Sequence, residues 1–227
     1  MTSFKIHTPK QPSKKDRERL GALLEIERSL WATGYVHIAG IDEVGAGPLA
    51  GPVVAAAVIL PIEADLPGVD DSKALSPARR ERMDTAIREV AIAWSLGICS
   101  VEEIDTLNVY QASREAMRRA LEGLCVVPNY ILVDARSVPK CTIPQRPIVK
   151  GDATSLSIAA ASIVAKVARD AMMCALAQEF PVYGFEQHKG YGTVMHLEAL
   201  RDHGPCVAHR RSFAPVRMHA QAHVLSP

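Results

Sequence analysis

The sequence lacks several features that define large protein classes. Although 48% of the 227 residues are hydrophobic, no run of about 18 consecutive apolar residues is present, so we expect no membrane-spanning helix. The basic N-terminus has no apolar segment like that of a secretory signal peptide. The cysteines, Cys99, Cys125, Cys141, Cys174 and Cys206, are odd in number and form no C-x-x-C pair, which argues against a zinc site or a disulfide framework. We therefore expect a cytoplasmic protein with reduced thiols.

Net charge is also almost absent. The formal charge is +1, so the overall composition does not indicate a nucleic-acid partner. Residues 1–20 differ, because their basic side chains leave a local net charge of +4. This segment, with its flexible part at residues 1–13, is either a solvated terminus or an arm that steers a polyanionic substrate, and the residues favour neither interpretation.

The hydrophobic pattern predicts one α/β domain preceded by a helix. Apolar residues within 14–32 recur close to every 3.6 residues, so we predict an amphipathic helix that ends near Gly34. Ser76 and Pro77 have the pattern of an N-cap and a first helical residue, for a helix that reaches about residue 90. Further helices are predicted at about 101–106, 108–123, 153–180 and 193–203, followed by a tail interrupted by prolines.

Five segments predict strands, at 37–43, 53–60, 92–99, 129–134 and 146–150. The first two should be antiparallel, because a loop rich in glycine and proline reverses the chain between them. Strands and helices do not alternate strictly, so we expect a mixed five-stranded sheet flanked by helices.

The most informative stretch is residues 38–52, Ile-Ala-Gly-Ile-Asp-Glu-Val-Gly-Ala-Gly-Pro-Leu-Ala-Gly-Pro. An apolar run places Asp42 and Glu43 directly before a loop with three glycines and two prolines. A buried charge must be paired or must hold a metal, and glycines allow the backbone to approach a ligand closely. These residues suggest a metal site that meets a phosphate-bearing partner.

Two more acids lie at similar places. Asp134 closes the strand at 129–134, and Asp152 lies between the fifth strand and the long helix. Since ligands of open α/β sheets gather where strands end, the four acids can converge. Neighbouring residues of a regular strand point to opposite faces, so Asp42 and Glu43 share one site only if their strand twists, bulges or ends there.

Four clustered carboxylates would repel one another, and two divalent cations would balance their charge. Oxygen ligands of this kind favour Mg²⁺ or Mn²⁺ over zinc. Two such ions roughly 3.5–4 Å apart can stabilise the attacking water and the leaving oxygen of a phosphodiester. Asp170 lies 18 residues after Asp152, about 27 Å further along a continuous helix, so we predict that it is a structural partner of Arg169 or Lys166.

Residues 42–53 resemble the signature of type 2 ribonuclease H (ribonuclease HII), Asp-Glu-Val-Gly-Arg-Gly-Pro-Leu-Ala-Gly-Pro-Val, except that Ala46 replaces the usual basic residue. The resemblance extends over about residues 20–218. Its other matches are Asp71-Ser72-Lys73, Lys150-Gly151-Asp152, the helix segment 157–166, Gly190-Tyr191-Gly192-Thr193 and His209-Arg210-Arg211-Ser212-Phe213.

The resemblance implies a ribonuclease H-like catalytic domain at residues 35–180, after an N-terminal helix at 14–34. A C-terminal helical region at 181–227 would complete the substrate cleft. The resemblance further implies metal-dependent cleavage of the RNA strand in RNA–DNA hybrids. It also implies incision 5′ to single ribonucleotides in duplex DNA, leaving 3′-hydroxyl and 5′-phosphate ends. Asp42, Glu43, Asp134 and Asp152 would be the catalytic acids, holding two Mg²⁺ or Mn²⁺ ions.

The same resemblance implies which residues meet the substrate. Gly45 and Gly47 would present backbone to the 2′-hydroxyl, whereas Ala46 cannot supply the phosphate contact of the usual basic side chain. Tyr191 would stack on a sugar, and Ser72 with Lys73 would hold the substrate backbone. The roles of two matches stay open: Lys150 gives electrostatic support or merely ends a strand, and residues 209–213 face nucleic acid or dock the tail. We assign none of the eight histidines to catalysis.

Two rival interpretations remain. A junction resolvase would use similar carboxylates, although the glycine loop and Gly-Tyr-Gly-Thr argue against it. A non-catalytic protein that binds hybrids is disfavoured by the presence of all four acids. The loop lacks Gly-Lys-Ser/Thr, which argues against a nucleotide triphosphatase. We expect a monomer that binds hybrids and ribonucleotide-containing duplexes, and no clear motif supports a sliding-clamp contact.

Overall fold

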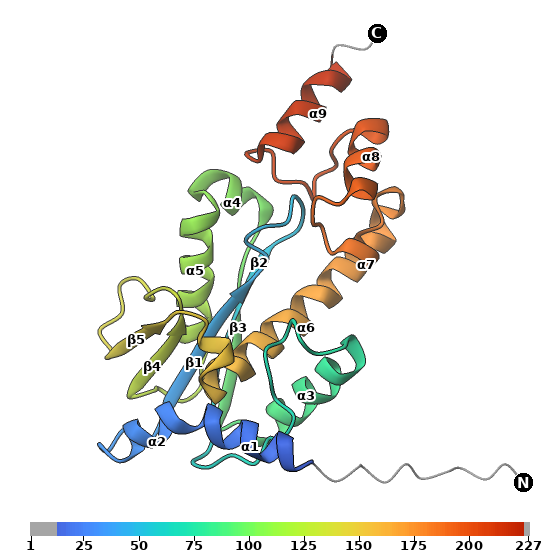
Figure 1. Ribbon diagram of the computed structural model, residues 1–227. Coiled ribbons are helices and arrows are strands. Elements are labelled where there is room, and N and C mark those ends of the chain that lie inside the picture. Colours follow the sequence, from blue (N-terminus) through green and yellow to red (C-terminus); the bar gives the residue numbers. More distant parts are fainter. Residues whose placement is uncertain (1–12, 225–227) are drawn as a thin grey trace, which may run out of the picture.

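A mixed sheet with strand order β3-β2-β1-β4-β5 forms the centre of the computed structural model, which describes residues 13–224 (Figure 1). The strands are β1 Ile38–Val44, β2 Val53–Ile59, β3 Ala93–Cys99, β4 Tyr130–Asp134 and β5 Gln145–Ile148. β1 pairs with β2, and β2 with β3, in antiparallel fashion, whereas β4 runs parallel to both β1 and β5. The predicted mixed five-stranded sheet and its antiparallel first pair are confirmed. The basic tail before residue 13 lies outside the described residues.

The helices are α1 Lys14–Leu23, α2 Glu25–Trp31, α3 Pro77–Val90, α4 Val101–Leu107, α5 Val109–Glu122, α6 Leu156–Glu179, α7 Phe185–His188, α8 Val194–His203 and α9 Ala214–Val224, with short 3-10 turns at Gly151–Ala153 and Pro181–Tyr183. Three of our boundaries were wrong. The predicted helix at 14–32 is two helices, which meet at Leu24. The long helix begins at Leu156, because Ser155 caps it after the 3-10 turn.

The third error concerns the tail, which contains α9. After residue 203 we predicted only a tail interrupted by prolines. Pro215 is the second residue of α9, and a proline in the first turn of a helix costs no hydrogen bond because that N–H has no partner within the helix.

Two helical layers cover the sheet. β2 is buried along its whole length, and its side chains alternate between the layers. Ala56 and Val58 pack with α6 and α1, whereas Ala55 and Ala57 pack with α5. A strand covered on both faces needs apolar residues throughout, which explains the continuous apolar run at 53–60.

One glycine lets α6 approach the sheet closely. A Cβ atom at Gly40 of β1 would lie 2.0 Å from the backbone carbon of Ser157 in the first turn of α6. Only glycine leaves room for this approach. The contact fixes the start of α6, and therefore the 3-10 turn that holds Asp152, beside β1.

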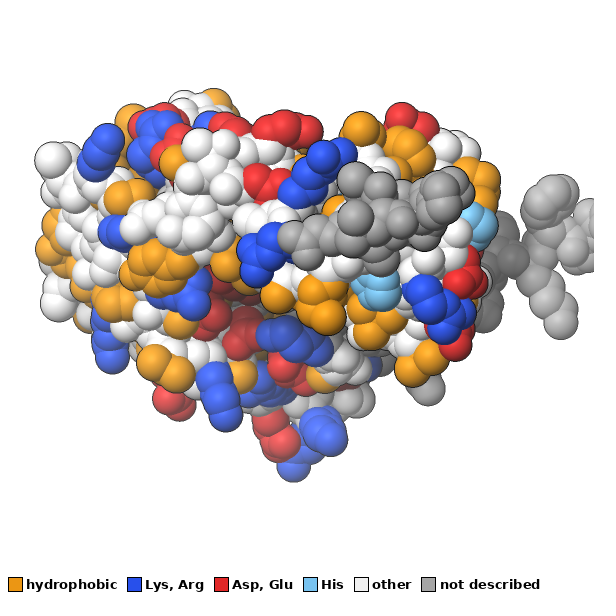
Figure 2. All heavy atoms as spheres, turned by 90° about the horizontal axis from the view of Figure 1, so that it is seen from above, with side chains coloured by type: hydrophobic (Ala, Val, Ile, Leu, Met, Phe, Trp, Pro, Cys, Tyr) orange, Lys and Arg blue, Asp and Glu red, His pale blue; other side chains and the backbone are white. Residues whose placement is uncertain are grey.

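The C-terminal helices gather at one end of the molecule, beyond the loop that joins β1 to β2 (Figure 1). Viewed from that end, acidic and basic side chains are mixed over the visible face, as expected for a net charge of +1 (Figure 2). Over the described stretch, no helix is both long and apolar enough to cross a membrane.

Candidate active site

Asp42 and Glu43 both reach one pocket from opposite faces of β1. The strand pairs regularly with β2 as far as Val44, but its pairing with β4 stops at Ile41. Beyond that point β1 has a free side, where both acids line a cavity of about 290 Å³. The pairing of β1 therefore ends on its β4 side only. The end of a strand is one of the conditions under which Asp42 and Glu43 can share a site.

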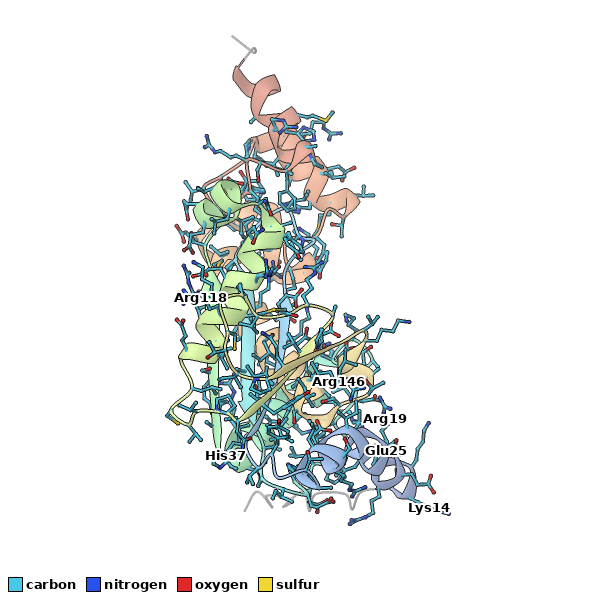
Figure 3. The ribbon with its side chains drawn as sticks, turned by 90° about the vertical axis from the view of Figure 1, so that its left-hand side faces the viewer. Lys14, Arg19, Glu25, His37, Arg118 and Arg146 are labelled. Carbon is cyan, nitrogen blue, oxygen red and sulfur yellow. The ribbon has the colours of Figure 1, made fainter. Side chains whose placement is uncertain are left out.

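Asp134, at the end of β4, lines the same cavity. Its Oδ1 accepts a hydrogen bond of 2.7 Å from the backbone N–H of Gly151, the residue before Asp152. The 3-10 turn that carries Asp152 is also tied to α1, because Arg19 donates to the carbonyl oxygen of Ala153 at 3.0 Å (Figure 3). The structure thus brings the strand-end acid and the turn acid together through one backbone contact.

Asp152 is buried, and its carboxylate receives a hydrogen bond of 3.2 Å from the Lys73 ammonium, which itself lines the cavity. Glu43 lies 3.9 Å from the guanidinium of Arg136. Arg136 in turn stacks over the ring of Tyr110. These cations lie at the rim of the acidic pocket and offset part of its negative charge.

Burial and mutual repulsion disturb the titration of the acids. Burial, followed by the charges of Glu43 and Asp134, raises the pKa of Asp42 well above its usual 3.8. Burial is also the main cause that raises the pKa of Glu43 and of Asp134, and repulsion adds to it in both cases. Ionising these carboxylates costs free energy in the metal-free protein. A bound cation would lower that cost.

The side chains around the cavity have the chemistry of ligands for a divalent metal. Within residues 13–224, no group of three or more acidic, histidine or cysteine side chains is positioned to hold a metal ion as the side chains stand. As they stand, Asp152 accepts a hydrogen bond from Lys73 and Asp134 accepts one from the Gly151 N–H. The donors themselves are carboxylates around a polar cavity, which is the ligand chemistry of Mg²⁺ and Mn²⁺. The set fits such ions once these two contacts are exchanged.

The glycine loop and the Tyr191 segment lie side by side. A Cβ at Gly47 would stand 3.7 Å from Cε1 of Tyr191, and the Leu49 N–H donates to the Gly190 carbonyl at 2.8 Å. Tyr191 also lines the cavity of the acids and is 44% exposed, so its ring is open to a ligand. The structure therefore places the two strongest non-acidic matches next to each other.

The structure also places the remaining residues of the resemblance. Lys73 and Ser72 both line the cavity, and Ser72 is buried and shares a 2.9 Å hydrogen bond with Ser162 of α6. Lys150 adopts a left-handed backbone conformation at the start of the 3-10 turn. Phe213 packs against the hydrophobic core, so residue 213 docks the tail.

Two buried arginines lie beneath the loop, although the sequence suggested Arg169 only as a partner of Asp170 and Arg210 only as part of the 209–213 match. The guanidinium of Arg169 in α6 donates to the carbonyl oxygens of Pro52, Ala50 and Lys189. Arg210 donates to those of Gly45, Ala46, Gly51 and Pro52. For Arg169, the available signal in the sequence was an arginine within an Ala-rich helix. Asp170 pairs with Lys166 at 2.7 Å, as one of our two alternatives had it.

Three histidines are also buried, near Tyr191. His188 and His196 stack with ring centroids 4.4 Å apart, and His196 contacts His209 through their Nε2 atoms at 3.0 Å. Nδ1 of His196 donates to the Tyr191 carbonyl oxygen at 2.9 Å. These histidines pack the Tyr191 segment against the C-terminal region and lie outside the acidic cavity.

The mixed sheet flanked by helices and its likeness to solved structures place the chain in the ribonuclease H-like class. The solved ribonuclease H2 of Pyrococcus horikoshii superposes on the chain with a TM-score of 0.72 at 26% identity, over 83% of this chain and 99% of that one. The chain belongs to the ribonuclease HII family, whose model matches residues 39–216. It is therefore an endoribonuclease of the ribonuclease H type.

Two further relatives support this assignment. Ribonuclease HII of Myxococcus xanthus is 52% identical over 214 residues, which are 94% of this chain and 73% of the relative. Ribonuclease HII of Archaeoglobus fulgidus, solved in complex with PCNA, is 27% identical with a TM-score of 0.64, over 77% of this chain and 92% of that one. Proteins of the ribonuclease H family depend on divalent metal ions.

Proposed function

We propose that the protein incises duplex DNA on the 5′ side of a single embedded ribonucleotide and also cleaves the RNA strand of RNA–DNA hybrids. Both reactions would leave 3′-hydroxyl and 5′-phosphate ends. The observation that carries the proposal is the meeting of Asp42, Glu43 and Asp134 in one cavity with Lys73 and Tyr191. This cavity combines carboxylates for metal ions with a cation and an aromatic ring for nucleic acid.

Asp42, Glu43, Asp134 and Asp152 would hold two Mg²⁺ or Mn²⁺ ions. We assign Asp42 and Asp152 to the ion on the side of the attacking water, and Glu43 and Asp134 to the ion on the side of the leaving 3′-oxygen. When bound, such ions lower the pKa of water and stabilise charge on the phosphoryl group and on the leaving oxygen.

The chain's own residues would then bind and orient the substrate. Lys73 reaches the cavity rim and would contact a phosphate, while Tyr191 would stack on the nucleotide beyond the ribonucleotide, an interaction worth ~1–3 kcal/mol per base. The backbone of Gly45 and Gly47 would meet the ribose. Residues 181–227 would complete a cleft whose acids come from residues 35–180.

The test is cleavage of three labelled substrates with Mg²⁺, Mn²⁺ or EDTA. They are a DNA duplex with one ribonucleotide, the same duplex in all-DNA form, and a long RNA–DNA hybrid. We expect metal-dependent incision 5′ to the ribonucleotide while the all-DNA duplex stays intact. An intact ribonucleotide duplex beside a cleaved hybrid would overturn the first part of the proposal. An Asp134→Asn protein that kept full activity would overturn the assignment of the acids.

A protein that binds hybrids without cleaving them is the rival from another class, and Ala46 is the feature that favours it. Binding of the ribonucleotide duplex with no cleavage under any metal condition would support that rival. We also propose that the protein acts as a monomer in the cytoplasm. Gel filtration with light scattering would test its state, and a PCNA-type clamp added to the cleavage assay would test a clamp partner.

A further inference from the structure

The loop between β1 and β2 is held from below by two buried guanidinium groups. Arg169 and Arg210 are each fully buried, and each donates only to backbone carbonyl oxygens. In the described part of the chain, neither forms an ion pair with a carboxylate. Two positive charges, held by carbonyl oxygens rather than by a carboxylate, therefore lie under the loop, and Gly47 of this loop adjoins Tyr191, which lines the cavity of the acids. Burying a charge is costly unless it is hydrogen-bonded, and the carbonyl oxygens of the loop supply these hydrogen bonds.

The direction of these hydrogen bonds fixes the direction of the loop amides. The Gly45 carbonyl accepts from Arg210 at 2.6 Å and the Ala46 carbonyl at 3.2 Å, so both carbonyls point inward. In a trans peptide the N–H of the next residue points the opposite way. The N–H groups of Ala46 and Gly47 must then point away from the guanidinium. Neither donates a hydrogen bond to any residue within 13–224.

The second guanidinium joins this loop to the Tyr191 segment. Arg169 donates to Ala50 and Pro52 on the loop and, at 3.0 Å, to the carbonyl of Lys189, two residues before Tyr191. A Cβ at Gly45 would lie 2.3 Å from Nε of Arg169, so the left-handed glycine and the arginine fit each other. One side chain thus sets the spacing between the two segments that would contact the nucleotide.

We propose that Arg169 and Arg210 are positioning residues, which turn the Ala46 and Gly47 amides toward the substrate and give this loop the positive charge that the Ala46 side chain lacks. Two outward N–H groups above a buried cation form a receptor for an oxygen of the ribonucleotide or its adjoining phosphate. The inference rests on the proposed function, because it concerns discrimination between ribonucleotide and deoxyribonucleotide.

Lysine replacements test the role with the charge retained. A lysine ammonium cannot match the planar fork that grips several carbonyls at once. For Arg210→Lys and Arg169→Lys we expect the preference in binding, the Kd for the all-DNA duplex divided by the Kd for the ribonucleotide duplex in EDTA, to fall at least tenfold. KM for the ribonucleotide duplex should rise by a similar factor, with kcat changed less than threefold, because the acids are untouched.

The matched control is Arg119→Lys on α5, whose guanidinium binds Glu103, Glu115 and the Ile98 carbonyl and, among the described residues, donates to none of the loop. It should lose stability without a change in substrate preference. Wild-type preference in both Arg169→Lys and Arg210→Lys would overturn the proposal. A fall in preference that Arg119→Lys reproduces would also overturn it, because the effect would then be one of general stability.

A measurement on the wild-type protein covers the case in which the lysine variants fail to fold. Ala46 and Gly47 amide resonances are followed with EDTA present while a ribonucleotide-containing duplex or its all-DNA counterpart is added. We expect shifts that are larger with the ribonucleotide duplex, and equal shifts or none would overturn the proposal. Because this readout needs no cleavage, failure of the proposed incision activity remains distinguishable from failure of the inference.

Discussion

The ammonium group of Lys73, which lines the cavity of the acids, lies 3.2 Å from Oδ2 of Asp152. Lys73 is 77% exposed at its side chain, whereas Asp152 is only 8% exposed. The lysine therefore covers one of the acids that we assign to metal binding. A divalent cation at Asp152 must compete with this ammonium, which couples metal binding to the position of Lys73.

Replacing Lys73 with glutamine should strengthen metal binding and weaken substrate binding. Exposed ion pairs contribute ~0.2–1 kcal/mol, so Mn²⁺ affinity of the substrate-free protein should rise by up to about fivefold. Loss of one phosphate contact should reduce the salt dependence of duplex binding by ~0.9 in slope. Titration calorimetry with Mn²⁺ and duplex binding at several salt concentrations measure both effects. Lys14→Gln on α1 is the control, and an equal change there would contradict the role of Lys73.

Neutralising one acid should stabilise the metal-free protein while it abolishes cleavage. Burial and neighbouring charges raise the pKa of Asp42 in the folded state, so its ionisation costs stability as pH rises through that value. At pH 7.5 in EDTA, Asp42→Asn should therefore raise Tm, and ~2–4 °C would correspond to 1 kcal/mol in a domain of this size. The gain should shrink as pH is lowered.

Added Mn²⁺ should favour the wild-type protein over Asp42→Asn in the same thermal melts. The wild-type protein should gain more in Tm than Asp42→Asn, because the ion binds the folded state and needs the carboxylate. Thermal melts with and without metal, beside a cleavage assay, check both parts. A lower Tm for the variant in EDTA would contradict the electrostatic interpretation of this cavity.

Restoring a basic residue at position 46 should tighten binding. Ala46 is half-buried on the loop, and its N–H points away from Arg210, because the Gly45 carbonyl of the same peptide accepts from that guanidinium. An arginine there adds one phosphate contact, so Ala46→Arg should bind a ribonucleotide-containing duplex more tightly and with a salt slope steeper by ~0.9. Ala46→Leu adds bulk without charge and is the control. Unchanged affinity and slope in the arginine variant would refute the prediction.

The buried histidines predict a loss of stability in mild acid. Burial lowers the pKa of His196 to about 4 and that of His209 to about 3, so both are neutral in the folded protein at pH 7. The unfolded chain takes up these protons near pH 6.5. The contribution of the neutral histidines to the free energy of unfolding is therefore fully present above that pH. It falls as pH drops from about 6.5 to 4, by up to ~1.4 kcal/mol per pH unit for each histidine.

Urea unfolding at pH 7.5, 6.0 and 5.0 measures this dependence. His209→Gln should be less stable than the wild type at pH 7.5, because it loses the contact with His196, but its stability should fall less steeply with pH. The raised pKa values of the acids make the protein more stable at lower pH, which opposes the effect of the histidines. The quantity compared is therefore the difference in free energy of unfolding between the wild type and His209→Gln at each pH. Parallel pH curves would show that the histidines do not cause the loss.

The sequence predicted those parts of the site that depend on local pattern. Asp42, Glu43 and Asp134 are recognisable because acids at the ends of apolar strands break the pattern of a buried sheet, and the structure places them in one cavity. Arg169 and Arg210 could not be found in that way. Their partners are carbonyl oxygens, which every residue has, and those of the loop lie more than a hundred positions away.

Helix boundaries depended on similar non-local facts. The turn at Gly151–Ala153 exists because Arg19 and Asp134 hold its backbone, and neither residue is near it in sequence. The division of the N-terminal helix at Leu24 has no strong sequence marker. The mixed sheet itself was predictable, since the β1–β2 loop and the lack of strict alternation between strands and helices are both visible in the sequence.

The close packing of β1 on α6 predicts that Gly40 cannot be replaced. A Cβ at this position would meet the backbone of Ser157 and Ile158 at 2.0–2.5 Å, and backbone atoms cannot rotate away as a side chain can. Gly40→Ala should therefore destabilise the fold by about 3 kcal/mol or more, at the upper end of the cost of overpacking. It should also displace the turn that holds Asp152 and lower cleavage in the fraction that folds.

Gly21→Ala is the matched control for this substitution. A Cβ at Gly21 would have no neighbour within 4 Å, and the residue lies within α1. Alanine is favoured over glycine inside a helix by roughly 0.5–1 kcal/mol, so this variant should be as stable as the wild type or more so. Urea unfolding of both variants compares the same chemical change at a closed and an open position. Equal stability of the two would mean that α6 can move away from β1, and the position of Asp152 would then not depend on Gly40.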